Sequence, residues 1–115
     1  MSAFSDAELS YLRSERRLAR LATVGPDGTP HVTPVGWSYN ADLDTIDVGG
    51  RDFANTKKFR DVSRTGRAAI VIDDVLPPWQ PRAVSVRGRA EAIAEPGPLI
   101  RLYPDEVRSW GLETG

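Results

Sequence analysis

The sequence of 115 residues predicts a mainly β fold, a small β-barrel with two short helices. Several stretches alternate apolar and polar residues, as Ala83 to Ile93 does, which is the period of a half-buried strand. Glycine and proline clusters end these stretches, and only two stretches have the apolar spacing of a helix. Five to seven strands joined by tight turns, with few free edges, are typical of a small closed barrel.

The first predicted element is a short helix over residues 5–15. Ser5-Asp6-Ala7-Glu8 has the spacing of a capping box, with the serine as N-cap and the glutamate at the third helical position. Phe4 and Leu9 fall at the two positions of a hydrophobic staple. The chain is therefore expected to enter the barrel through a capped helix.

A hairpin and a third strand are predicted next. Leu18 to Val24 forms the first strand, Gly25-Pro26-Asp27-Gly28 is a strong turn signal, and Pro30 to Tyr39 forms the second strand. Asn40-Ala41-Asp42 then turns the chain into a third strand, Asp44 to Val48.

The second predicted helix covers about Phe53 to Arg64, and Ala68 to Ile72 is a continuous apolar run that predicts a strand buried on both faces. Val75 to Pro81 contains three prolines and is predicted to be irregular. Ala83 to Ile93 is a long strand, and the tail from Leu99 to Leu112 is expected to hold another short strand. The predicted buried stripe of the second helix consists of Phe53, Thr56, Phe59 and Val62.

Composition and charge exclude several kinds of site. The chain has no cysteine, and one histidine, His31, cannot form a histidine-cluster metal site. A net charge of -1 gives no general case for nucleic acid, and no apolar run approaches the roughly 20 residues of a membrane span. We expect one cytoplasmic domain over residues 1–115 that gains stability as a homodimer, because its own core is modest.

A strand that ends in two glycines and is followed by a basic helix predicts an anion site. Val48 precedes Gly49 and Gly50, and the helix that follows carries Lys57 and Lys58 in its first turns. Glycines let a ligand approach the backbone, and free N–H groups at a helix start attract anions. Residues 51–67 hold six basic and two acidic residues, so we expect a phosphate here, most simply that of a cofactor. A solvated pair of lysines is the alternative.

The second strand offers an irregular surface. Alternation places His31, Thr33 and Val35 on one face, and Pro34 marks an edge or a bulge because it has no N–H to donate. Such a strand can present backbone groups to a flat ring, although the pattern by itself favours a plain edge strand. Trp79 lies in the proline-rich segment and is expected either to anchor that loop or to stack on a ring.

Several of these motifs together resemble one known family over essentially the whole chain. They are Ala22 to Val35, Asp47 to Gly50, Lys58 to Val62 and Val86 to Glu91. The chain resembles the split β-barrel flavin and deazaflavin oxidoreductases, the pyridoxamine phosphate oxidase-like superfamily. Its ending, Ile100 to Glu113, resembles the actinobacterial branch that depends on coenzyme F-420, a deazaflavin.

The resemblance implies a homodimer with two cofactor sites at the subunit interface. It implies that the second strand lies beside the cofactor ring, that Thr56 and Lys58 hold the cofactor phosphate with Arg51 nearby, and that the loop of Trp79 approaches the ring. Two positions depart from the family pattern, because Thr56 replaces a common basic residue and Asp61 a common asparagine. The expected cofactor-binding residues are His31, Thr33, Pro34, Val35, Val48, Gly49, Gly50, Arg51, Thr56, Lys57, Lys58 and Trp79.

The expected function is hydride transfer between coenzyme F-420 and a small organic substrate that the sequence does not specify. The cofactor carries this chemistry itself, so no protein nucleophile is required. Two alternatives stay open at this point. One is an oxidoreductase of the same fold that uses FMN, and the other is a non-catalytic protein that only binds a flavin or deazaflavin.

Overall fold

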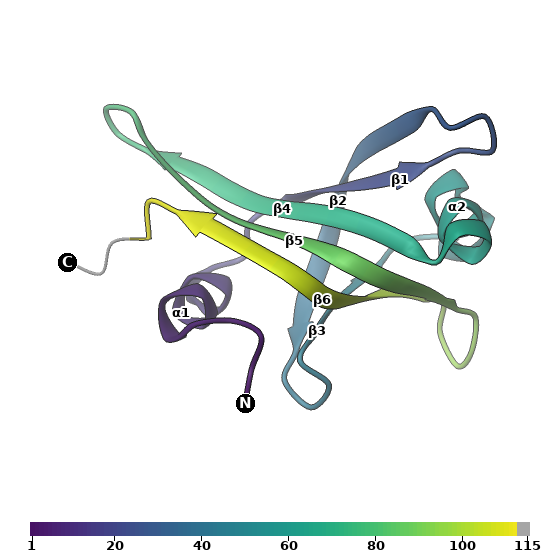
Figure 1. Ribbon diagram of the computed structural model, residues 1–115, viewed down its shortest axis with the longest axis horizontal. Coiled ribbons are helices and arrows are strands. Elements are labelled where there is room, and N and C mark those ends of the chain that lie inside the picture. Colours follow the sequence, from purple (N-terminus) through teal and green to yellow (C-terminus); the bar gives the residue numbers. More distant parts are fainter. Residues whose placement is uncertain (113–115) are drawn as a thin grey trace.

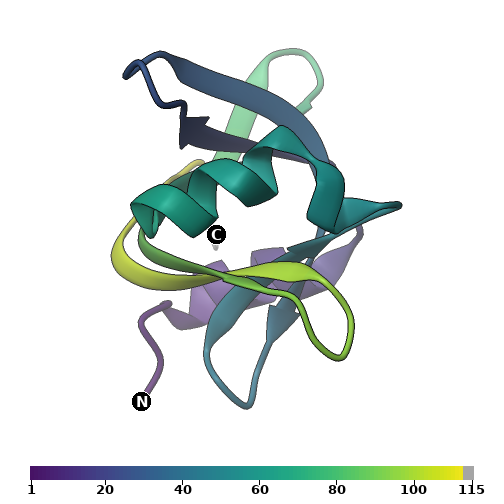
Figure 2. The same ribbon diagram turned by 90° about the vertical axis from the view of Figure 1, so that its right-hand side faces the viewer.

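The computed structural model describes residues 1–112 and contains a closed six-stranded antiparallel barrel with two α-helices (Figure 1). Neighbouring strands around the barrel follow the order β1-β2-β3-β6-β5-β4. The helix α2 lies at one end of the barrel, and α1 lies toward the other end (Figure 1 and Figure 2). The elements are α1 Asp6–Ser14, β1 Ala19–Val24, β2 Pro30–Asn40, β3 Thr45–Gly49, the 3-10 turn η1 Phe53–Asn55, α2 Lys57–Thr65, β4 Arg67–Leu76, β5 Gln80–Ile93 and β6 Leu99–Trp110.

The predicted capping box at the start of α1 is confirmed. The hydroxyl of Ser5 accepts from the backbone N–H of Glu8 at 3.1 Å, and the Glu8 carboxylate accepts from the Ser5 N–H at 2.8 Å. Phe4 is buried and meets the ring of Tyr39 edge-on, with centroids 5.7 Å apart. These contacts fix α1 against the barrel.

The barrel interior is filled by the inward-facing residues of all six strands. Burial alternates along β1 and β5, as expected for strands with one face on a core. The largest fully buried side chains include Leu21, Ile46, Ile70, Ile72, Val84, Val86, Ile100 and Leu102.

Three sequence predictions for the second half of the barrel are wrong. The segment over Val75 to Pro81 is mostly strand, because β4 and β5 stay in register up to the pair Leu76 and Gln80 and only residues 77–79 form the turn. β4 is not buried on both faces, since Ile70 and Ile72 are buried while Ala69 and Val71 between them are only partly covered. The tail is not a short strand but the 12-residue β6 that closes the barrel between β3 and β5.

The second predicted helix is interrupted at Thr56. This residue has extended backbone angles, φ -82° and ψ 155°, and separates η1 from α2. Its hydroxyl donates to the Phe53 carbonyl oxygen at 2.7 Å and accepts from the Phe59 N–H at 3.3 Å. Thr56 is therefore the N-cap of α2 and not a residue of its buried stripe.

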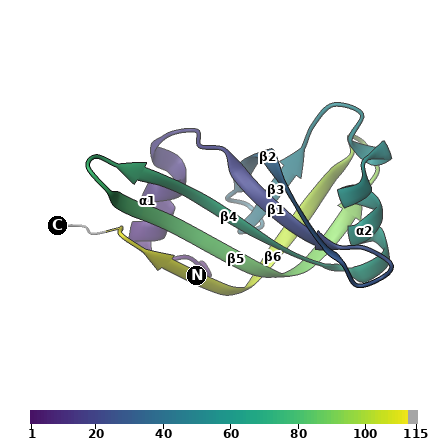
Figure 3. The same ribbon diagram turned by 90° about the horizontal axis from the view of Figure 1, so that it is seen from above.

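β2 changes partners halfway along its length. Its residues 30–35 pair with β1, and its residues 36–40 pair with β3. Pro34 lies in the part that pairs on one side only, as an edge proline should. The barrel is thus split along the first half of β2, which the view from above shows crossing over β1 (Figure 3). Among residues 1–112, no helix combines the length and apolar character needed to cross a membrane.

Candidate functional site

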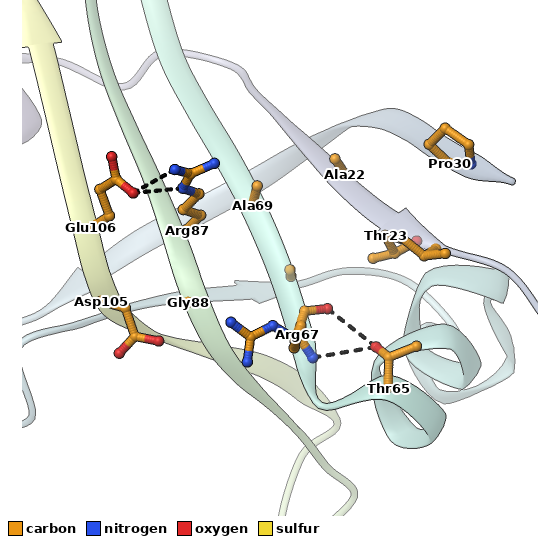
Figure 4. Close-up of a pocket in the computed structure, with 12 residues that line it drawn as sticks. Ala22, Thr23, Pro30, Thr65, Arg67, Ala69, Arg87, Gly88, Asp105 and Glu106 are labelled. Atoms are coloured by element: carbon orange, nitrogen blue, oxygen red, sulfur yellow. Dashed lines mark hydrogen bonds and ion pairs between the residues drawn. The ribbon is translucent and has the colours of Figure 1, made fainter. Parts of the chain in front are cut away.

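An open groove of about 710 Å³ lies on the outer face of the barrel. Its centre is a row of aligned residues, in which Ala22 of β1 pairs with Ala69 of β4, Ala69 with Arg87 of β5, and Arg87 with Glu106 of β6. Figure 4 shows these side chains along neighbouring strands, with the end of α2 beside them. The groove is lined by Ala22, Thr23, Val24, Pro30, Thr65, Arg67, Ala68, Ala69, Arg87, Gly88, Asp105 and Glu106.

The floor of the groove is made of small residues and its rim is charged. Ala22 and Ala69 contribute only methyl groups and Gly88 no side chain, so this part of the lining carries no large side chain and suits a planar ligand. On the rim, Arg87 donates to the Glu106 carboxylate through Nε at 2.9 Å and through NH2 at 2.5 Å. Arg67 forms no ion pair within residues 1–112, so its charge is available to a ligand.

The apolar surface continues from the groove onto β2. Val32 is the register partner of Ala22 and is 69% exposed, and Pro30 is the register partner of Val24, which is 43% exposed. Single exposed apolar residues are common, but a continuous apolar face beside a groove indicates a binding surface.

A cluster of basic side chains lies next to residues that line the groove, although its own members do not line it. We call His31, Lys57 and Arg64 the cationic cluster. The position that a Cβ atom would take on Gly25 lies 3.1 Å from Nζ of Lys57 and 3.2 Å from Nε2 of His31. Arg64 donates through NH2 to the backbone carbonyl of Val24. Lys57 of α2 and His31 of β2 thus meet over one glycine, and Arg64 binds the backbone next to it.

The cationic cluster is organised around a buried carboxylate. Asp61 is 2% exposed and accepts from the Thr23 hydroxyl at 2.9 Å and from Nζ of Lys57 at 3.2 Å, while NH2 of Arg64 lies 3.6 Å away. Burial acts to raise the pKa of Asp61, but hydrogen bonds from Thr23 and Lys57 and the two positive charges outweigh it and lower that pKa. Asp61 is therefore ionised and holds both cations in place.

The structure separates the two lysines that the sequence places together. Lys57 points toward the β1–β2 hairpin, whereas Nζ of Lys58 lies 5.6 Å from the centroid of the Phe53 ring. Thr56 uses its hydroxyl as a cap, and Arg51 is exposed in the turn before η1. The expected phosphate residues therefore do not converge, because adjacent positions on a helix point about 100° apart.

The other expected residues of β2 and β3 differ in how far they are exposed. Val35 and Val48 are 6% and 0% exposed, so only their backbone atoms can meet a ligand. Thr33 is half-buried, and Pro34 is exposed on the opposite face of β2. Gly49 and Gly50 are exposed at the end of β3, where Gly49 pairs with Gly36 of β2.

Trp79 belongs to a different region of the chain. It is 74% exposed in the turn between β4 and β5, which projects beyond the barrel at the end opposite α2 (Figure 1). Within one chain this turn is far from the cationic cluster. Any contact of Trp79 with a cofactor would therefore involve the site of a second subunit.

Sequence reasoning missed Thr23, Asp61 and Arg64. A signal for the helix residues was present, because Lys57, Asp61 and Arg64 follow one another at spacings of four and three and so share one helix face. Thr23 could have been found as the polar residue at an inward position of β1.

Comparison with known proteins assigns the family. Residues 5–110 match the pyridoxamine 5'-phosphate oxidase family. The chain belongs to that family. It is also 37% identical, over 96% of its length and 84% of the relative's length, to the 5a,11a-dehydrotetracycline/5a,11a-dehydrooxytetracycline reductase of Streptomyces rimosus.

Solved structures give the same fold for this family member. The conserved hypothetical protein Rv2991 of Mycobacterium tuberculosis superposes with a TM-score of 0.78 at 22% identity, covering 97% of this chain and 88% of that one. A structure described as an F420 reductase superposes with a TM-score of 0.66 at 19% identity, covering 86% and 94%. The family and the reductase relative together support an oxidoreductase of the split-barrel type.

Proposed function

We propose that this protein is a coenzyme F-420-dependent reductase that transfers a hydride to a small organic substrate. The observation that carries the proposal is the groove lined by Ala22, Ala69 and Gly88, with the cationic cluster on residues that neighbour its lining in the sequence. The groove suits a planar ring, and the cluster suits a phosphate attached to it. The match to a reductase of Streptomyces rimosus supports the reaction class.

The residues present fit a phosphorylated planar cofactor. Gly25 has no side chain, and Lys57 and His31 reach over the space that one would fill, so an anion there would meet two nitrogen atoms. When bound, the reduced deazaflavin supplies the hydride, while the protein binds and orients it. Arg67 then supplies positive charge along the groove for acidic groups further from the ring.

A second copy of the chain is the proposed cover of this surface. The groove is open, and Val32 and Val24 continue it as exposed apolar surface. A dimer would bury that surface and exclude water from the hydride-transfer site. A dimer also brings a second β4–β5 turn, with Trp79, to the assembly.

FMN is the main alternative cofactor, and binding without catalysis is the other alternative. Coenzyme F-420 is favoured because its tail carries several carboxylates beyond the phosphate. The cations Arg67, Arg87 and Arg89 exceed what one flavin phosphate requires, although Arg87 is paired with Glu106 and Arg89 lies over the Tyr103 ring. The name of the Streptomyces rimosus relative gives dehydrotetracyclines as the substrates of that protein. We therefore propose to search first for a substrate of this chain among conjugated polycyclic compounds.

The test is a parallel titration of the purified protein with coenzyme F-420 and with FMN, followed by fluorescence. We expect micromolar or tighter binding of coenzyme F-420 and weak binding of FMN. Tight FMN binding would assign the flavin alternative instead. Binding of coenzyme F-420 without turnover of any acceptor in a screen of conjugated compounds would favour a binding protein, and binding of neither cofactor would contradict the proposal.

A further inference from the structure

A second open cavity, of about 540 Å³, lies between α1 and the projecting hairpin of β4 and β5. Figure 1 and Figure 3 both show α1 at this end of the barrel, away from α2. The walls come from α1, the two hairpin strands and the backbone that follows β6. A cavity of this size is within the range that holds small molecules.

This cavity is separate from the groove of the proposed function. The two have no lining residue in common. Arg82 lines the cavity and Arg87 lines the groove, and these residues are an odd number of positions apart on β5, before the register shift that follows Arg87. Their side chains therefore point to opposite faces of the sheet, and a ligand in the cavity would occupy a site of its own.

The cavity exists because α1 presents only small side chains to the hairpin at this point. Ala7, Ser10 and Ser14 follow one another at spacings of three and four, so they share one helix face. On another wall, a Cβ atom on Gly111 would overlap the carbonyl oxygen of Pro81, so the backbone after β6 lies directly against β5. The cavity is thus bounded by a fixed helix and by closely packed backbone.

Three polar groups of the lining have hydrogens to donate to a ligand. Within residues 1–112, the Ser10 hydroxyl and the Gln80 side-chain amide take part in no hydrogen bond. Arg82 binds Asp74 through Nε at 2.9 Å and through NH2 at 2.5 Å, which leaves the N–H groups of NH1. Arg82 lines the cavity and Asp74 does not, so NH1 is the part of this guanidinium that a ligand would meet.

The charge around Arg82 favours an anionic ligand. Two guanidinium groups, those of Arg17 and Arg82, share the single carboxylate of Asp74. The carboxylate of Glu15 is 65% exposed and lies 3.9 Å from Arg17, so water screens much of its charge. Burial and the hydrogen bond to Asp74 raise the pKa of Tyr11, so its hydroxyl adds no negative charge. One positive charge therefore remains in excess beside the cavity.

We propose that this cavity binds a small monocarboxylate with an apolar body. Arg82 would meet the carboxylate through NH1, while Ser10 and Gln80 donate further hydrogen bonds. Two carboxylate oxygens have enough lone pairs for these three donors, whereas a neutral amide has one acceptor oxygen and no charge. Leu76 and Leu112 of the lining provide apolar contacts for the rest of the ligand.

The test uses benzoate, with benzamide as a neutral compound of nearly the same shape. Each compound is titrated at constant pH and ionic strength into the full ¹⁵N-labelled chain. NMR follows the side-chain amide of Gln80 and the backbone amide of Gly111, which both lie in the cavity wall. We expect saturable shifts of both signals with benzoate in the millimolar range, and at least about tenfold weaker binding of benzamide.

Two substitutions of exposed side chains test the location of the site while Asp74 keeps its partners. Ser10→Asp places a carboxylate in the cavity wall and should weaken benzoate binding about tenfold or more by repulsion. Gln80→Ala removes one donor and should weaken it about threefold or more. Ser63→Asp is the matched control, because it makes the same change at an exposed position of α2, and it should leave the affinity within about twofold.

The site is wrong if benzoate shifts neither Gln80 nor Gly111, or if Ser10→Asp binds benzoate as tightly as the wild type does. Benzamide that binds as tightly as benzoate would contradict recognition of a carboxylate. These outcomes are independent of the cofactor titration, because the cavity and the groove have no lining residue in common. Either site can therefore fail while the other stands.

Discussion

The hydroxyl of Thr23 donates a 2.9 Å hydrogen bond to Oδ2 of Asp61, and both side chains are buried. Thr23 belongs to β1 and Asp61 to α2, so this bond fixes the helix against the hairpin. The second oxygen of Asp61 holds Lys57. One carboxylate therefore links the stability of the barrel end to the geometry of the proposed phosphate site.

Replacing Asp61 should cost stability in a pH-dependent way. Asp61→Ala leaves the Thr23 hydroxyl without its partner and should lower the free energy of unfolding by about 2 kcal/mol at neutral pH. Because the pKa of Asp61 is lowered in the folded protein, its stabilising contribution is complete above the ordinary carboxyl range and is lost as pH falls through the lowered value. Urea unfolding at neutral and acidic pH measures this.

Asp61→Asn is the matched control for that prediction. An amide can still accept from Thr23, so this variant should lose less stability than Asp61→Ala at neutral pH. The free energy of unfolding of Asp61→Asn should also change less between neutral and acidic pH than that of the wild type. Equal pH dependence in both proteins would show that Asp61 does not act through its charge.

A second carboxylate, Asp74 of β4, ties α1 to the barrel. It accepts from Tyr11 at 2.8 Å, from Nε of Arg17 at 3.2 Å and from Nε of Arg82 at 2.9 Å. The hydrogen bond from Arg82, together with those from Tyr11 and Arg17, lowers the pKa of Asp74 well below its usual range despite burial.

Asp74→Ala should be among the most destabilising changes in this chain. The Arg17 side chain, which is only 5% exposed, would keep no carboxylate closer than that of Glu15 at 3.9 Å, and removing one member of a buried pair costs about 3 kcal/mol or more. Thermal unfolding should show the loss, and proteolysis should open α1 first. Asp73→Ala on the same strand is the control, because its partner Arg20 is 49% exposed and such pairs contribute about 1 kcal/mol or less.

The sequence predicts the elements that depend on local contacts. The capping box at Ser5 and the turn at Gly25 involve residues within a few positions of one another, so their signals lie in short segments. The strand residues on both sides of the β4–β5 turn, and the full length of β6, were not predicted. They depend on pairing with β5, a 14-residue strand whose partners are distant in sequence. Pairing between strands overrides the weak strand preference of proline and aspartate.

The candidate functional site shows the same division between residues recognisable from the sequence and contacts that only the fold creates. The sequence identified Lys57 and His31 separately, since each has a recognisable chemistry. It could not show that they meet, because that depends on how α2 crosses the hairpin, and it could not show that Lys58 points away toward Phe53. The groove was also missed, since Ala22 and Ala69 become a surface only when β1 and β4 pair.

The bulge at Gly88 in the groove floor should not tolerate a side chain. A Cβ atom there would lie 2.3 Å from the carbonyl oxygen of Tyr103 and 2.7 Å from the backbone nitrogen of Asp105. Because both are backbone atoms of β6, Gly88→Ala should lower the free energy of unfolding by about 2 kcal/mol or more. Denaturant unfolding checks this, with Gly36→Ala as the control, because a Cβ atom at Gly36 would meet nothing within 4 Å.

The apolar face that includes Val32 provides a direct test of the proposed dimer. Val32 is 69% exposed in the single chain and lies beside the groove, so a partner that covers the groove would bury it. Light scattering should give a dimer for the wild type and a monomer for Val32→Asp at the same concentration, because an unpaired buried carboxylate is costly. Leu43→Asp changes another exposed apolar residue, in the β2–β3 turn, and should remain a dimer. A wild-type monomer, or a Val32→Asp dimer as stable as the wild type, would remove this face as the subunit interface.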